Sequence, residues 1–79
     1  MPKFPIDAPL ERVLRALDQL GFVVIRHGNH VALARANPDG TRSTLTLPGH
    51  RTIKGSTLRS ALAQARISRE DFLQAFEES

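Results

Sequence analysis

Apolar residues recur at helical spacing near the start of the chain, at Leu10, Val13, Leu14 and Leu17. Spacings of three and four residues place such side chains on one face of a helix, which can then pack against a core. Asp7 precedes this stripe as a candidate N-cap, and Pro9 is tolerated in a first helical turn. Gly21 follows where glycine commonly ends a helix. The pattern predicts a helix between Asp7 and Gly21 with one buried face.

The middle of the chain changes to the composition and period of β-strands. Three segments have this character: residues 22–26, 30–36 and 41–47. Turn-forming residues at 27–29 and 37–40 separate them, Pro48 ends the third, and a polar loop follows over 49–54. Strands joined by tight turns pair in an antiparallel manner. We therefore expect a three-stranded antiparallel sheet.

Two further helices are predicted after the strands. Gly55-Ser56-Thr57 opens the first, whose apolar stripe consists of Leu58, Ala61, Leu62 and Ala65. Ser68 is a candidate cap for a short last helix, whose apolar residues are Phe72, Leu73 and Phe76. The expected fold class is α+β: a small antiparallel three-stranded sheet, with helices on one face and the other face open.

Composition and length narrow the class of protein. With 79 residues, 41% of them hydrophobic and 24% charged, we expect one globular domain over residues 1–79. The absence of cysteine excludes disulfides and thiolate metal sites. No apolar run is long enough for a bilayer, and residues 1–7 lack the core of a signal peptide. The expectation is a cytoplasmic protein with no membrane partner and no cofactor.

Positive charge is concentrated in the centre of the chain. Residues 25–59 carry six basic residues against Asp39 alone, a net charge of +5, whereas the whole chain has +3. All three histidines, His27, His30 and His50, fall in this stretch. Such a bias favours an anionic partner, although an ordinary solvated surface also fits. Without Trp or Tyr, stacking of bases on exposed aromatic rings is disfavoured.

His30 is the strongest candidate for chemistry. It follows Gly28-Asn29 and begins the alternating segment of the second strand. If Val31 and Leu33 face the core, then His30, Ala32 and Ala34 face the open side of the sheet. Histidine ordinarily titrates near neutral pH, so a histidine in this position suits a general acid or base. The alternative is a solvated histidine at a turn.

Other residues are candidates for contacts with a phosphate backbone. Lys54, Ser56 and Thr57 stand at a helix start, where free N–H groups and the helix dipole favour anions; Ser56 or Thr57 acting as a cap is the alternative. His50 is a second candidate for acid–base work or for a phosphate contact, and His27 is expected to be solvated. Five arginines are candidate backbone contacts: Arg26, Arg35, Arg42, Arg51 and Arg59. The histidines are too loosely spaced for us to expect a metal site.

The chain resembles the HicA-type toxins of toxin–antitoxin systems. The resemblance rests on the element order, on Gly28-Asn29-His30, on residues 47–50 and 53–62, and on the tail 65–73, and it extends from about residue 8 to residue 76. It implies a fold like that of double-stranded-RNA-binding domains and a ribosome-independent endoribonuclease that cleaves mRNA. It also implies His30 as the single catalytic histidine. The partner it implies is a HicB-type antitoxin, bound by a toxin that is monomeric when free and hetero-oligomeric in the complex.

The chain departs from the family pattern at two places. Asn29 stands where Ser is common, and Gly55-Ser56-Thr57 replaces the common Gly-Thr.

Two other functions are alternatives. A double-stranded RNA-binding module would need no histidine. A DNA-reading helix-turn-helix over 56–66 and 69–77 would need a basic second helix, whereas that helix is mostly acidic.

Overall fold

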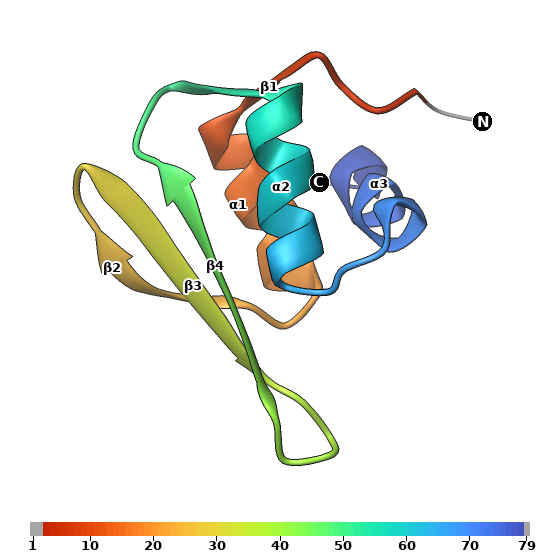
Figure 1. Cartoon of the computed structure of the whole chain (residues 1–79). Helices are drawn as coiled ribbons and strands as arrows, with labels where there is room; N and C mark the ends of the chain where they lie inside the picture. Colours follow the sequence, from red (N-terminus) through yellow and green to blue (C-terminus); the bar gives the residue numbers. More distant parts are fainter. Residues whose placement is uncertain (1–2, 79) are drawn as a thin grey trace.

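A computed structural model describes residues 3–78; residues 1–2 and 79 of the expected domain lie outside the described part. Its elements are β1 (Asp7–Pro9), α1 (Leu10–Gln19), β2 (Val23–His27), β3 (His30–Ala36), β4 (Arg42–Pro48), β5 (Thr52–Lys54), α2 (Gly55–Gln64) and α3 (Arg69–Glu78). Figure 1 shows how they are arranged. The three long strands and the helices confirm the predicted α+β fold.

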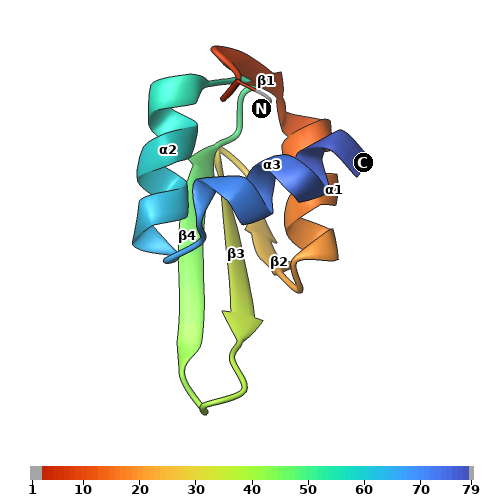
Figure 2. The same ribbon diagram turned by 90° about the vertical axis from the view of Figure 1, so that its right-hand side faces the viewer.

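Strands β2, β3 and β4 form one antiparallel sheet with β3 in the centre. The helices lie on one side of this sheet, with α3 next to α1, and the other side carries none of the described helices (Figures 1 and 2). The core lies between the sheet and the helices, because the predicted stripes, apart from the half-buried Leu14, are buried there together with Val31, Leu33, Leu45 and Leu47. The predicted open face is therefore present.

Ala34 is a correction to the expected open face. Although it alternates with Leu33 and belongs to the uncovered side, it is only 3% exposed. It pairs with Val23 on β2 and with Thr44 on β4. These larger neighbours on both sides of the central strand shield the small methyl group from water.

A β-bulge in β2 decides which residues of that strand face each side. Val24 pairs with Leu33, but Arg26 pairs with Ala32 and His27 with Val31, so Ile25 is the extra residue. Without the bulge, Arg26 would lie opposite Val31, which is fully buried on the helix side. The bulge therefore moves Arg26 to the open face and His27 to the helix side, the re-aiming of side chains that bulges commonly provide.

Strand β2 is an exposed edge of the sheet. Its apolar residues Val23, Val24 and Ile25 are 60%, 46% and 54% exposed. An edge strand with exposed apolar side chains can accept a further chain, and a bulge is one of the devices that limits such pairing.

The start of α1 differs from the prediction. Asp7 is not its N-cap, because it lies in β1, which pairs with β5; the cap position belongs to Pro9 and has no side-chain hydrogen bond. Residues 52–54, expected in a loop, form β5. Each of these strands has three residues, too few to show a recognisable alternation.

The start of α2 is also a correction. Lys54 occupies the cap position without a side-chain hydrogen bond, so neither Ser56 nor Thr57 caps the helix. The backbone N–H of Gly55 instead donates to the carbonyl of Ile6 in the N-terminal segment. Two other end signals are confirmed: Gly21 has φ +93° after α1, and the Ser68 hydroxyl accepts a 3.1 Å hydrogen bond from the N–H of Asp71.

The predicted turn between β3 and β4 is held by side chains. The Asp39 carboxylate accepts hydrogen bonds from the hydroxyl of Thr41 and, at 2.9 Å, from its backbone N–H. These two bonds favour the charged form and hold the pKa of Asp39 below its ordinary value. Asn37 donates to Thr41 and Ser43 across the same turn. These side chains therefore hold the β3–β4 turn and have a structural role.

Candidate functional site

His30 is exposed and begins β3 at the hairpin that connects it to β2. Its neighbour Val31 is fully buried on the helix side, so alternation directs His30 to the open face. On the neighbouring strand β4, its partner is Pro48. Within residues 3–78, no hydrogen bond or ion pair holds its imidazole ring. The ring is therefore available to a ligand on the open face.

Arg26 is the cation that the fold brings to the same face. Because of the bulge it lies opposite Ala32, two residues from His30 on one side of the sheet. Such diagonal neighbours are about 7–8 Å apart, within the reach of a long side chain. The small side chain of Ala32 does not block the space between Arg26 and His30. An imidazole and a guanidinium thus share a flat, open surface.

Gly49 holds the hairpin that carries His30. Its N–H donates a 2.8 Å hydrogen bond to the carbonyl of Asn29, and the Gly28 N–H donates one of 3.2 Å to the His30 carbonyl. A Cβ at Gly49 would lie 2.5 Å from the Gly28 oxygen and 2.9 Å from that of Asn29. Only glycine allows the two loops to approach this closely. The position of His50 is thereby coupled to that of His30.

His50 and Arg51 lie on the other side of that hairpin, in a cleft against α1. This α1 cleft is lined by His50 and Arg51 together with His27, Glu11 and an apolar floor. The sequence had indicated a solvated His27; it is exposed, but it faces the helix side because it pairs with Val31. The structure therefore brings two of the three histidines together and places His30 on the opposite face.

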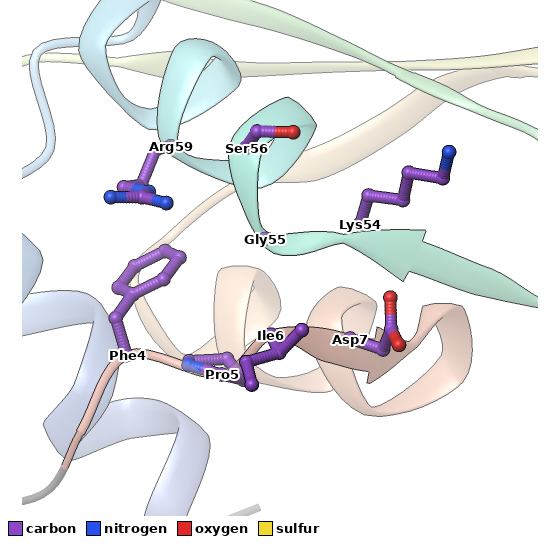
Figure 3. A pocket seen from close by; sticks show the side chains of 8 residues that line it. All are labelled: Phe4, Pro5, Ile6, Asp7, Lys54, Gly55, Ser56 and Arg59. Atoms are coloured by element: carbon purple, nitrogen blue, oxygen red, sulfur yellow. The ribbon is translucent and has the colours of Figure 1, made fainter.

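Lys54, Ser56 and Arg59 line a second hollow where the N-terminal segment crosses the start of α2 (Figure 3). The guanidinium of Arg59 stands over the Phe4 ring, 5.6 Å from its centroid. All three side chains are exposed, whereas Thr57 is half-buried and does not line the hollow. Since Ile6 occupies the Gly55 N–H, the start of this helix offers one donor fewer to an anion than the sequence suggested.

Two other candidate arginines lie away from His30. Arg35 donates to the carbonyl of Leu20 at 2.9 Å and to the Asn37 side chain at 3.1 Å, and it stacks over Phe22. It is engaged in holding the sheet to the end of α1. Arg42 is exposed but pairs with Ala36 at the far end of the sheet.

Among the described residues 3–78, no group of three His, Asp or Glu side chains is arranged to hold a metal ion. None of their helices is long and apolar enough to cross a bilayer.

Comparison with known families decides the relationship. A family model described as the HicA toxin of bacterial toxin–antitoxin systems matches residues 11–67, more than half of the chain. This chain belongs to the HicA toxin family. The match includes the β2–β3 hairpin with His30, the start of α2 and the part of the α1 cleft from Glu11 onward, whereas Leu10, β1 and α3 lie outside it. Neither the curated proteins nor the solved structures yielded a match.

Family membership gives the HicA-family chain a general role. It is a toxin of a toxin–antitoxin system, so it pairs with an antitoxin.

Proposed function

We propose that this chain is an endoribonuclease that cleaves mRNA without a metal ion and without the ribosome, with His30 as general acid or base. The observation that carries the proposal is that the exposed His30 and Arg26 occupy neighbouring positions on the open face of the sheet. The family match adds support, because it includes this hairpin and HicA toxins are RNA-cleaving toxins.

RNA cleavage does not require a nucleophile from the protein, because the 2′-hydroxyl of the RNA is the nucleophile. The 2′-oxygen attacks phosphorus, the bond to the 5′-oxygen breaks, one proton leaves the 2′-oxygen and another reaches the 5′-oxygen. An imidazole can take the first proton or give the second, and a guanidinium stabilises the charge that develops on the phosphate. In this proposal His30 transfers a proton and Arg26 neutralises charge.

The remaining candidate residues bind the RNA on either side of the cut. His50 and Arg51 lie next to the His30 hairpin, and Lys54, Ser56 and Arg59 continue along the start of α2. Thr57 is half-buried and does not line the hollow at the start of α2, so it is the least accessible of these residues. Cations spread in this way give affinity and orientation but little sequence preference.

The proposed antitoxin is a HicB-type protein with an acidic surface that covers His30. The exposed apolar edge of β2 adjoins the His30 face and offers a contact surface beside the charges. Charge complementarity would speed the encounter, and burial of the edge would slow dissociation. In this proposal the toxin is monomeric when free and forms a hetero-oligomer with the antitoxin.

The proposal is tested with the purified chain and a labelled mRNA in EDTA. Cleavage that persists in EDTA, and that stops when the HicB-type antitoxin is added, is the expected result. Binding of the RNA on a gel without any cleavage would instead assign the chain to non-catalytic double-stranded RNA-binding modules.

Lys54→Gln is expected to weaken RNA binding in a way that salt reveals. Removing one phosphate contact to single-stranded RNA lowers the slope of log Kd against log salt concentration by about 0.7. The measurement is a salt series of binding by fluorescence anisotropy, in a His30→Ala background so that the RNA stays intact. Arg15→Gln, an exposed cation on α1, is the matched control. An unchanged slope for Lys54→Gln would remove Lys54 from the backbone contacts.

A further inference from the structure

The α1 cleft is large enough to hold one nucleotide base. It measures about 560 Å³, within the range of ligand pockets in proteins. Leu10 and Leu14 form its apolar floor, one helical turn apart on α1. The imidazoles of His27 and His50 and the guanidinium of Arg51 line its polar part. Histidine rings are among the side chains on which unpaired RNA bases stack.

The fold builds this cleft from parts that are distant in the sequence. The N–H of Leu10 donates a 2.8 Å hydrogen bond to the carbonyl of Arg51, which fixes the start of α1 against the loop that carries His50. The bulge at Ile25 turns His27 toward the same side. Gly49 then connects this loop to the His30 hairpin through its bond to Asn29. The cleft and His30 therefore stand on either side of one hairpin tip.

Glu11 is the one carboxylate that lines the cleft. It is exposed, and within residues 3–78 no hydrogen bond or ion pair engages it. An ionised carboxylate has two acceptor oxygens and no donor. The other lining groups are two imidazoles, one guanidinium and apolar side chains. Glu11 repels the phosphates of an RNA and needs another ligand group to face it. A pair of N–H donors is the group that fits.

We propose that the α1 cleft binds an unpaired guanine of the RNA, with the Glu11 carboxylate reading its Watson–Crick edge. This inference rests on the proposed ribonuclease function and deepens it. Guanine is the base whose edge presents two adjacent donors, N1–H and the N2 amino group, which match the two oxygens of a carboxylate. Adenine, cytosine and uracil each place an acceptor beside their donor, and that acceptor would face a negative oxygen.

The remaining guanine groups also find partners in the cleft. O6 and N7 are acceptors, and His27, His50 and Arg51 offer donors. The base packs on Leu10 and Leu14, and its phosphate reaches back over the hairpin tip toward His30. Glu11 is thus a specificity-determining residue, which sets where the RNA is cut while His30 moves the proton.

The test compares guanosine with inosine, which lacks only the N2 amino group. Two uridine hexamers, one with a central guanosine and one with a central inosine, are bound to His30→Ala protein in an anisotropy assay. We expect the guanosine hexamer to bind about tenfold more tightly, because inosine loses the hydrogen bond from N2 to the charged carboxylate and keeps the one from N1. In the Glu11→Gln variant the ratio should fall to about twofold or less, since an amide presents one acceptor and one donor.

Asp18→Asn is the matched control, because it removes the same charge from an exposed position near the other end of α1. It should keep the tenfold ratio. Equal binding of the two hexamers by the parent, or a ratio that survives in Glu11→Gln, would overturn the assignment. Because the readout is binding, it separates this inference from the ribonuclease proposal, which fails only if RNA cleavage is absent or independent of His30.

Discussion

Replacing His30 with alanine should lower the rate of RNA cleavage by a factor on the order of 10²–10⁴, the usual contribution of a general acid or base. The imidazole is exposed and, among the described residues, holds no hydrogen bond, so its removal takes away a proton carrier and no packing. Stability should change by no more than about 0.5 kcal/mol, as for surface substitutions elsewhere. The rate is measured under single-turnover conditions with a 5′-labelled RNA in EDTA.

Two controls make the His30 result specific. Thr44→Ala, on the exposed part of β4, tests whether any change on the open face lowers the rate. Thermal denaturation of both variants shows whether they remain folded. If His30→Ala cleaved RNA at the parental rate, another group would carry the proton, and the open face would be only a binding surface.

The sequence predicted the central sheet and the helices because their patterns are long. The large apolar residues Val31 and Leu33 stand two positions apart in a seven-residue strand, so the faces of Val31 and His30 follow from the pleat alone. The stripes of α1 and α2 recur over several turns. Elements of this length contain enough repeats for periodicity to decide both their type and the side that is buried.

The bulge in β2 could not be predicted from the sequence. Residues 22–25 are all apolar, so the alternation that would show a shifted register is absent. The faces of Arg26 and His27 depend on that shift. His27 is exposed, as predicted, but its place in the α1 cleft could not be assigned from the sequence. The β1–β5 pair was not predicted for a related reason. Three-residue strands are defined by their pairing partners and not by a pattern of their own.

The candidate site was only partly predictable because it is made by contacts across the fold. His30 could be found from a local motif. The approach of His50 to the His30 hairpin depends on the register of β4 against β3 and on Gly49, and Glu11 enters the cleft because Leu10 bonds to Arg51. Gly49, directly after Pro48, was the sequence signal of a close backbone approach. The segment it approaches, Gly28-Asn29, is distant in the sequence and could not be inferred from it.

Gly49→Ala should both destabilise the protein and reduce cleavage. Its added Cβ would overlap the backbone oxygens of Gly28 and Asn29, which cannot rotate away as a side-chain end could. Overpacking of this kind costs about 1–3 kcal/mol, and relief requires the His50 loop to move away from the His30 hairpin. Because an error of about 1 Å at a reacting group can cost on the order of 10²-fold in rate, the loss of cleavage should exceed the fraction of protein that is unfolded.

Gly28→Ala is the matched control for the stability effect of Gly49→Ala. A Cβ at Gly28 would meet nothing within 4 Å, and its φ is not in the positive range that favours glycine. Its free energy of unfolding should stay within about 0.5 kcal/mol of the parent. Chemical denaturation measures both variants, and the single-turnover assay measures cleavage at a temperature where Gly49→Ala is folded. If Gly49→Ala matched the parent in stability and rate, the contact between the two loops would have no part in positioning His30.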